Sequence, residues 1–312
     1  MVWRIIIIIF ISILVFNKNV KILSADEIKT PHHVYVGIYT GGDKSNPNEG
    51  GWDNDDDYSV DREMVNWQNR NFAFEMTFMT PDFNINNVET NTYQELELIW
   101  YYGRVPIVNL TYDSWQNCQK TWVQIDEELS NPSSYTYQGL INWAKGLKKW
   151  FDLGKLSSKN NRFLFVVLFQ EPNYSHCAIE SNKSTWDFVD PKAFKSAFRK
   201  ARTIIESVVG ADYKSKIHWI FSPNRDSNQF MPGFEEYYPG DDVVDWVGLS
   251  AYNYGGYKIG NFTFPWQYFR EFAKPYFDRI RKMAPSKPLA LLQTGSISFG
   301  GDKNAWLKDL FN

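Results

Sequence analysis

Short apolar runs alternate with helical patterns along most of this chain, and the alternation limits the folds that are open to it. Seven runs are rich in β-branched and aromatic residues, namely 34–40, 72–78, 105–110, 163–170, 217–222, 243–251 and 289–293. Most are continuously apolar, which is typical of parallel strands that are covered on both faces. The pattern therefore predicts an α/β protein built on a parallel sheet.

Helix signals fill the segments between these runs. The clearest helix is predicted to begin with Asp190 as its N-cap and Pro191 in its first position. Apolar residues then recur at helical spacing, at Phe194, Ala197, Phe198, Ala201, Ile204, Ile205 and Val208. Segments 140–151 and 266–283 repeat this pattern. We expect these apolar faces to pack against the sheet.

Seven β-units in a row favour a barrel over an open, doubly wound sheet. No glycine-rich phosphate loop follows the first predicted strand, which weakens the nucleotide-binding alternative. A closed barrel of this type has eight strands, whereas the last predicted helix, which contains Trp306, brings the sequence to its end at residue 312. We therefore expect an α/β (β/α)8 TIM barrel that lacks the eighth β/α unit. Such a barrel would expose two parallel edges.

The first 25 residues have the layout of a secretory signal peptide. Arg4 gives a positive start, residues 5–16 are almost wholly apolar, and Ala25 marks the expected cleavage site. The apolar stretch is shorter than the ~20 residues that span a bilayer, and a retained membrane anchor is the alternative. We expect a secreted protein in which residues 26–312 form one barrel domain with no stable membrane association. The net charge of −3 gives no basic signal, so nucleic acid is not an expected partner.

Secretion also bears on the cysteines and the glycosylation motifs. Cys118 and Cys177 are the only cysteines, and an even pair in a secreted chain predicts one disulfide, with two buried thiols as the alternative. Glycosylation motifs occur at Asn109, Asn173, Asn182 and Asn261. The first two lie at predicted strand ends, so Asn182 and Asn261 are the expected glycan sites.

In a (β/α) barrel the active site lies at the carboxyl ends of the strands. Glu171 follows the fourth predicted strand, and Gln293 ends the seventh. Retaining glycosidases need two carboxyl groups about 5 Å apart, one as acid/base and one as nucleophile. Strands four and seven can supply such a pair, with Glu171 as the acid/base. Gln293 in the nucleophile position is an amide, which cannot attack an anomeric carbon but can hydrogen-bond a sugar hydroxyl.

Five further strand-end residues are expected to bind substrate: Gln170, Asn173, Asn224, Tyr252 and Asn253. For Asn224, ordinary turn chemistry after a strand is an equal alternative, and for the last two the alternative is a place in the core. The histidines show no metal-ligand spacing, and the acidic run 53–57 lacks the offsets of a calcium loop. No metal and no other cofactor is expected.

Several motifs in a fixed order resemble glycoside hydrolase family 26. The strongest are WIFSPN at 219–224, YPGDD at 238–242 and VDWVGLS at 244–250, with TGS at 294–296 and GGDK at 300–303 as a second group. The likeness runs from GIYTGG at 37–42 to the end of the chain. The order and spacing of the motifs carry the resemblance, because no single one is specific on its own.

Well-known members of this family are retaining endo-β-1,4-mannanases, so the resemblance implies a barrel that handles a β-linked polysaccharide, β-mannan first. The family's acid/base motif is similar to His-Glu-Met-Asn-Gly, and Glu171 carries over as the acid/base in a segment that reads QEPNY. The family's nucleophile is a glutamate where this chain has Gln293. The resemblance thus implies impaired catalysis.

Three functions remain open at this point, and a monomer is expected in each. One is a glycan-binding protein with impaired hydrolysis. Another is an active hydrolase, either a β-mannanase or a β-glucan or xylan endo-hydrolase of the same barrel clan, since Gln170-Glu171-Pro172 also resembles the Asn-Glu-Pro of family 5. The third is a truncated product without function.

Overall fold

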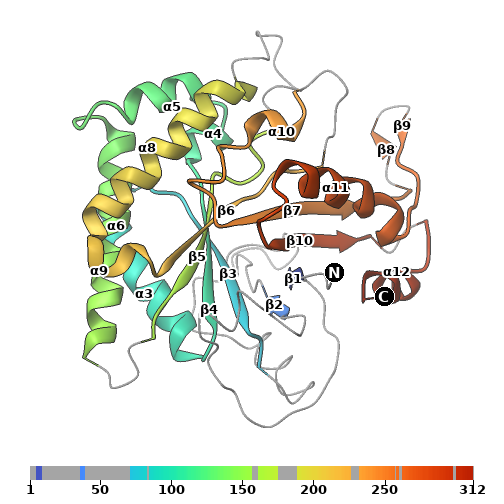
Figure 1. The fold of residues 1–312 in the computed structure, drawn as a ribbon, viewed down its shortest axis with the longest axis horizontal. Helices are drawn as coiled ribbons and strands as arrows, with labels where there is room; N and C mark the ends of the chain where they lie inside the picture. Colours follow the sequence, from blue (N-terminus) through green and yellow to red (C-terminus); the bar gives the residue numbers. More distant parts are fainter. Residues whose placement is uncertain are drawn as a thin grey trace.

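The computed structural model describes residues 5–8, 36–38, 71–82, 84–156, 161–174, 188–225, 232–256, 258–259, 262–297 and 300–311 (Figure 1). Eight parallel strands in these ranges form a closed barrel in the order β1-β10-β7-β6-β5-β4-β3-β2. They are β1 (Ile5–Ile8), β2 (Val36–Ile38), β3 (Phe74–Met79), β4 (Val105–Leu110), β5 (Leu164–Leu168), β6 (Ile217–Phe221), β7 (Trp246–Asn253) and β10 (Leu289–Ser296). The short strands β8 (Lys258–Ile259) and β9 (Phe262–Thr263) form a separate antiparallel pair.

All seven strands predicted from the sequence are present, and the described residues after β10 contain one helix and no further strand. The prediction of a (β/α) barrel without the eighth β/α unit is therefore confirmed. β1 lies in the remaining place, with Ile5 in register with Leu289 of β10 and Ile8 in register with Gly37 of β2. A run of isoleucines suits a strand because β-branched residues favour extended backbone, and this pairing covers both edges of the seven-stranded sheet. Cleavage near Ala25 stays a prediction, and it would remove β1.

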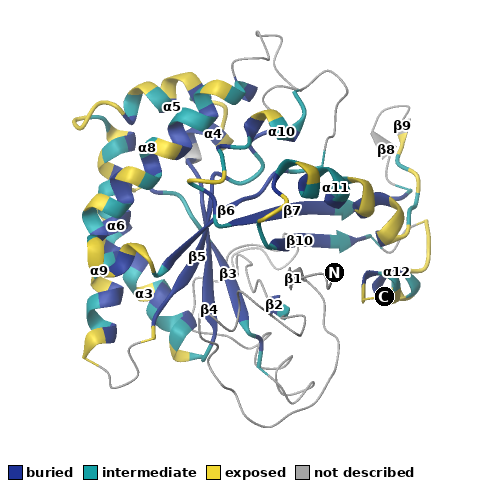
Figure 2. Ribbon diagram, viewed as in Figure 1, coloured by how far each residue is buried: buried dark blue, intermediate teal, exposed yellow. Residues whose placement is uncertain are grey.

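Helices cover the outer side of the β3–β7 part of the barrel and flank β10 (Figure 1). They are α3 (Val88–Tyr101), α4 (Asp113–Gln116), α5 (Trp122–Glu128), α6 (Tyr135–Lys155), α8 (Pro191–Val209), α9 (Ala211–Lys214), α10 (Phe234–Tyr237), α11 (Phe269–Met283) and α12 (Lys303–Phe311). The start of α8 is as predicted, because Asp190 Oδ1 accepts from the backbone N–H groups of Lys192 and Ala193. Figure 2 shows buried strands beneath helices that are exposed on one side. No helix in the described ranges is long and apolar enough to cross a membrane.

The barrel interior is filled by apolar side chains from all the longer strands. This inner cluster includes Phe74, Met76, Ile107, Phe165, Val167, Ile220, Trp246, Ala290 and Leu292. Because side chains alternate along a strand, residues two positions past an inner residue also face inward, nearer the carboxyl end. Asn109 follows Ile107 in this way, and Ser222 follows Ile220. The apolar interior therefore gives way to polar side chains at the end where a barrel of this type holds its site.

Strand β7 begins later and ends later than the predicted run 243–251. Val243 lies in a turn and Val244 in the segment between that turn and β7, and the next residue, Asp245, accepts the Trp219 backbone N–H at 2.9 Å through Oδ2. The extension at the other end reflects pairing with β10, where Tyr252 is in register with Gly295 and Asn253 with Ser296. Both strands thus carry two or three residues past the apolar core, toward the carboxyl end of the barrel.

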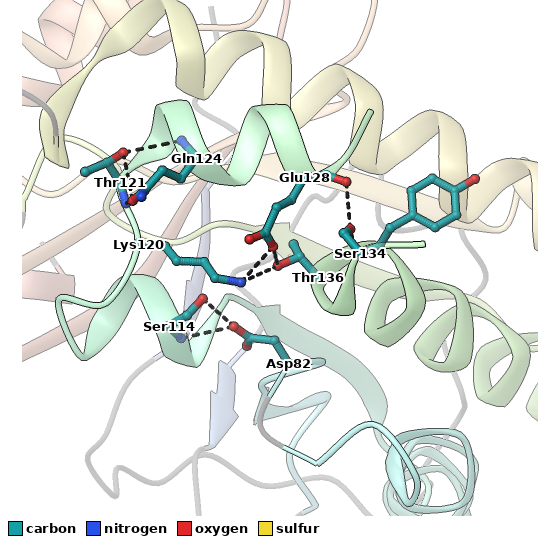
Figure 3. Close-up of polar contacts among 9 residues, drawn as sticks. Asp82, Ser114, Lys120, Thr121, Gln124, Glu128, Ser134 and Thr136 are labelled. Carbon is teal, nitrogen blue, oxygen red and sulfur yellow. Dashed lines mark hydrogen bonds and ion pairs between the residues drawn. The ribbon is translucent and has the colours of Figure 1, made fainter. Parts of the chain in front are cut away.

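A polar network fixes the loops that follow β3 and β4 (Figure 3). In the segment after β4, Lys120 Nζ lies 2.7 Å from Glu128 Oε2 and donates to Thr136 Oγ1 at 3.0 Å. These contacts link that segment to α5 and α6. The Ser114 backbone N–H donates to Asp82 Oδ2 at 3.1 Å. These contacts hold one rim of the barrel's carboxyl end in a defined position.

Candidate functional site

The backbone is strained where β5 ends. Phe169 and Glu171 both have left-handed conformations, with φ of 60° and 54°, which non-glycine residues rarely adopt. The turn directs the Phe169 ring outward, where its centroid lies 5.2 Å from Tyr112 and 5.3 Å from Trp122. The Glu171 backbone N–H donates to O of Ser222, the residue after β6, at 2.8 Å, which holds the turn in place. Backbone strain of this kind is concentrated at functional sites.

A β-bulge in β10 brings Gln293 into the same region. Leu291 is in register with Leu249 of β7, but Gln293 is in register with the next residue, Ser250, so Leu292 is the extra residue. Leu292 packs in the inner cluster, and Gln293 makes hydrogen bonds on the same side to Gln170, in the turn after β5, and to Tyr252 of β7. Bulges re-aim side chains in this way next to active sites. Without the bulge, strict alternation would turn Gln293 away from the barrel interior.

Gln293 is almost fully buried, with 5% of its surface exposed. Its Oε1 accepts from Gln170 Nε2 at 2.6 Å and from the Tyr252 hydroxyl at 2.8 Å. Its Nε2 faces Gln170 Oε1 at 3.3 Å and Met76 Sδ at 3.5 Å. Each side of the amide therefore has partners of the matching polarity.

Glu171 lies on the other side of Gln170. Its Oε1 accepts from Gln170 Nε2 at 3.1 Å and its Oε2 from Asn224 Nδ2 at 2.9 Å. Asn224 is held in turn by Asn173, whose Nδ2 donates to Asn224 O at 2.9 Å and whose Oδ1 accepts the Asn224 N–H at 3.0 Å. Six of the seven predicted catalytic and binding residues thus join one hydrogen-bonded set, namely Gln170, Glu171, Asn173, Asn224, Tyr252 and Gln293.

Gln170 also fixes the spacing of the two positions that retaining chemistry would use. Its Nε2 lies 3.1 Å from Glu171 Oε1 and 2.6 Å from Gln293 Oε1. These two oxygens therefore cannot lie much farther apart than the ~5–5.5 Å that separates the carboxyl groups of retaining glycosidases. The separation of the two side chains is therefore bounded near that of a retaining pair, with one carboxylate and one amide.

Asn253 does not join this set. It is buried, its Nδ2 donates to Ser296 Oγ at 3.1 Å, and its Oδ1 accepts the Gly255 N–H at 3.2 Å. It therefore links the ends of β7 and β10. In its place the structure brings in Ser250, whose Oγ lies 3.3 Å from Gln170 Nε2. Sequence reasoning did not single out Ser250, although counting back two residues from Tyr252 along the strand would have found it.

An aromatic surface borders the carboxylate. Tyr254 is 43% exposed, and its ring centroid lies 5.9 Å from that of Tyr252. Burial raises the pKa of Tyr254, the charges of Glu171 and Tyr174 add to this rise, and Arg225 opposes it. The phenol is therefore a neutral hydrogen-bond donor at neutral pH, and its partly exposed ring is available to a ligand.

Polar atoms without partners lie at the same end of the barrel. Asn109 is 1% exposed and Ser222 fully buried, yet neither the Asn109 amide atoms nor Ser222 Oγ has a hydrogen-bond partner. Both side chains lie on the inward-facing side of their strands, as described above. Buried polar groups without partners are uncommon and call for a ligand or water.

The predicted disulfide and glycan sites involve residues that lie, in part, outside the ranges the structure describes. Cys118, which has a φ of 59°, lies after α4, whereas Cys177, Asn182 and Asn261 lie outside the described residues, as does the acidic run 53–57. The disulfide and both glycan sites stay predictions. In the part of the chain that the structure describes, no group of three or more acidic, histidine or cysteine side chains could hold a metal ion.

The chain folds into a (β/α) barrel with a hydrogen-bonded polar cluster at the carboxyl ends of its strands. No family model matches the sequence. The chain is similar to solved structures of mannanases from Bacillus subtilis (15% identity over 88% of this chain and 75% of that one, TM-score 0.56) and from a symbiotic protist of the termite Reticulitermes speratus (13%, 84% and 74%, TM-score 0.52). It is also similar to a modular endo-β-1,4-mannanase from Cellulomonas fimi (14%, 77% and 53%, TM-score 0.51).

The chain therefore has the fold of the endo-β-1,4-mannanases of glycoside hydrolase family 26, and the resemblance predicted from its sequence is confirmed at the level of the fold. Among curated proteins it is similar to endoglucanase H from Acetivibrio thermocellus, with 24% identity over 121 residues. That match covers 39% of this chain and 13% of the endoglucanase.

Proposed function

We propose that this protein binds a β-linked glycan at the carboxyl end of its barrel and that its capacity for hydrolysis is strongly impaired. One observation carries the proposal: the position across from Glu171 holds the buried amide of Gln293. An amide has no negative charge with which to attack an anomeric carbon or to stabilise an oxocarbenium-like transition state. Loss of that carboxylate removes the covalent step of a retaining mechanism.

The remaining groups suit the recognition of sugar hydroxyls. Glu171 can accept hydrogen bonds, Tyr254 can donate one, and Asn109 and Ser222 have polar atoms without partners. Polar groups placed beside partly exposed aromatic rings are the usual composition of a pocket that orients a small polar ligand. Binding needs these groups only, whereas hydrolysis also needs the missing carboxylate.

β-Mannan is the first candidate glycan, because the similar structures are mannanases and one of them is complexed with gluco-manno-oligosaccharide. β-Glucan is the second candidate, because the curated relative is an endoglucanase. Both are β-linked, so the same polar groups serve either proposal.

The cellular setting is part of the same proposal. We infer a secreted monomer whose signal peptide ends near Ala25, with glycans at Asn182 and Asn261 and a disulfide between Cys118 and Cys177. The absence of a free cysteine among the described residues supports the disulfide. A bridge between the segments after β4 and β5 would brace the rim at the carboxyl end of the barrel, and titration of two free thiols in native protein would refute it.

The proposal is tested by measuring binding and hydrolysis on the same preparation. Calorimetric titration with manno-oligosaccharides is expected to give saturable binding. A parallel titration with cello-oligosaccharides tests the β-glucan alternative. Reducing-sugar release from soluble β-mannan is expected to stay at the level of a matched Glu171→Gln variant. Release that the Glu171→Gln change abolishes would show an active hydrolase and refute the impaired function. Absence of binding to either class would refute glycan recognition.

A further inference from the structure

Gln170 and Gln293 form a reciprocal amide pair. Gln170 Nε2 donates to Gln293 Oε1 at 2.6 Å, and Gln293 Nε2 donates to Gln170 Oε1 at 3.3 Å. Each side chain therefore presents both a donor and an acceptor to the other. The residues come from β10 and from the turn after β5, and this pair joins them.

The pair also satisfies the groups around it. Gln170 Nε2 has Glu171 Oε1 at 3.1 Å and Ser250 Oγ at 3.3 Å, and the Tyr252 hydroxyl donates to Gln293 Oε1 at 2.8 Å. Gln170 thus lies between Glu171 and Gln293 and contacts both. Any change of chemistry at position 293 acts first on Gln170.

A carboxylate at position 293 would be mismatched to this environment. The oxygen in place of Oε1 would keep two donors, Gln170 Nε2 and the Tyr252 hydroxyl. The oxygen in place of Nε2 would face Gln170 Oε1 at 3.3 Å and Met76 Sδ at 3.5 Å, neither of which can donate. A protonated carboxyl, in contrast, could donate to Gln170 Oε1 and reproduce the amide pair. The site therefore favours the neutral form of an acid at this position.

We propose that Gln170 is a positioning residue matched to Gln293, and that a carboxylate at position 293 becomes a nucleophile only when the acceptor oxygen of Gln170 is removed as well. The inference rests on the proposed function, because it treats this cluster as a retaining site with one carboxylate replaced. It adds to that function the inference that two residues, Gln170 and Gln293, together impair hydrolysis.

Of the charged and titratable neighbours, Glu171 acts in the same direction. Among the described residues, Tyr252 contacts position 293 directly, and Glu171 reaches it through Gln170. Tyr252 remains a donor in either state of the acid, whereas the negative charge of Glu171 disfavours a second carboxylate so close to it. Tyr254 lies beyond Tyr252 and is neutral at neutral pH.

The test compares Gln293→Glu with the double variant Gln170→His/Gln293→Glu, because an imidazole can present an N–H to position 293 without an adjacent oxygen. All glutamates are labelled with ¹³C at the side-chain carboxyl carbon. The resonance of residue 293 is identified by its absence from wild type and from Gln170→His, and its chemical shift is followed against pH. We expect the new carboxyl of Gln293→Glu to titrate roughly one to two pH units higher than that of the double variant. Reducing-sugar release from β-mannan is compared at a pH below both titrations, where the ionised fraction limits the rate. There it is expected to be ~10-fold faster in the double variant for each unit by which its carboxyl titrates lower.

Equal titration of the two carboxyls would overturn the inference, as would equal rates of hydrolysis by the two variants at that acid pH. Gln170→Ala/Gln293→Glu is the second variant, since it removes the acceptor oxygen without introducing a new titrating group. If the two carboxyls titrate differently as expected but no variant binds glycan, the proposed function is refuted. The inference about Gln170 and Gln293 would still stand. The two ideas therefore fail on different measurements.

Discussion

Gly248 of β7 lies so close to Leu292 of β10 that a Cβ atom on Gly248 would be 2.3 Å from Leu292 Cδ1 and 2.9 Å from its Cγ. Leu292 is the bulged residue and is 1% exposed, so it has little room to move. The bulge in turn gives Gln293 its inward direction. A glycine on one strand thus provides the space on which the site geometry of the next strand depends.

Replacing this glycine should therefore disturb both stability and the site. Gly248→Ala is expected to lower the free energy of unfolding by about 1–3 kcal/mol, the usual cost of overpacking a core. Glycan affinity should fall with it, because a displaced Leu292 moves Gln293. Urea unfolding followed by tryptophan fluorescence measures the first effect, and calorimetric titration measures the second.

Gly295→Ala is the matched control, because a Cβ there would meet only Tyr252 ring atoms at 3.5 and 3.7 Å, which is ordinary van der Waals contact. This variant should unfold within about 1 kcal/mol of wild type. Equal destabilisation by the two alanines would contradict the special role of Gly248.

Asn173 is predicted to hold Asn224, and through it Glu171, in place. Asn173→Ala removes both hydrogen bonds to the Asn224 backbone and should cost about 1–3 kcal/mol, because it leaves polar groups unpaired in a part-buried region. Asn173→Asp keeps the acceptor and loses the donor, so an intermediate loss is expected. Thermal or urea unfolding ranks the three proteins, and an alanine variant as stable as wild type would refute the role.

The same burial bears on glycosylation. Asn173 is 3% exposed and Asn109 1% exposed, and a folded chain has no room for a glycan on either amide nitrogen. Peptide mapping of protein secreted from a eukaryotic host is expected to find both unmodified, with glycans at Asn182 and Asn261. A glycan on Asn173 in folded protein would contradict the placement of that side chain.

An ion pair between α10 and α11 should make stability depend on acid pH. Arg279 donates to both carboxylate oxygens of Glu235 at 2.6 Å. Burial raises the pKa of Glu235, but the hydrogen bonds and charge of Arg279 outweigh burial and lower it overall. A lowered pKa in the folded state adds stability above the ordinary glutamate pKa of ~4.3, and that stability is lost as the pH falls through the lowered value.

Melting temperatures of wild type and Glu235→Gln should therefore differ at neutral pH and converge in acid. Glu236→Gln is the matched control, because Glu236 is exposed on the same short helix. This control should show no such convergence. The same pH dependence in both variants would contradict a specific contribution from the Arg279 contact.

Removal of residues 1–25 tests the place of β1. Without β1, the facing edges of β10 and β2 lose their partners, and unpaired edges weaken a sheet. Residues 26–312 should remain monomeric, because β2 has only three residues, but should melt at a lower temperature than the full chain. Light scattering and a thermal melt measure both properties. Equal melting temperatures would contradict a stabilising role for β1.

The sequence was sufficient for features that local rules govern. The seven strands and the start of α8 at Asp190 follow from continuous apolar runs and from capping preferences. The sequence also predicts that Glu171 and Gln293 lie near each other. Both follow or end strands whose carboxyl ends meet at the same end of a barrel. These features depend on residue type and order.

Other features depend on contacts that no local pattern reveals. The bulge at Leu292 results from the register between β7 and β10, and the left-handed backbone at Phe169 results from the contacts that hold the turn. Asn253 sits at a strand end like its neighbours but turns toward Ser296. The strand role of Ile5–Ile8 was not expected, because an apolar run at the start of a chain has the composition of a secretion signal.

The strained turn at Phe169 and Glu171 has an evolutionary consequence. Two left-handed residues without glycine cost about 1–3 kcal/mol each, and that cost reduces the stability margin of the whole protein. In a gene that had lost every function, substitutions that relax the turn would be free to accumulate, since they would only stabilise the fold. Here both bulky residues keep the costly backbone although Gln293 cannot serve as a nucleophile. If the protein binds a glycan as proposed, this costly turn is a feature that selection on ligand recognition would keep.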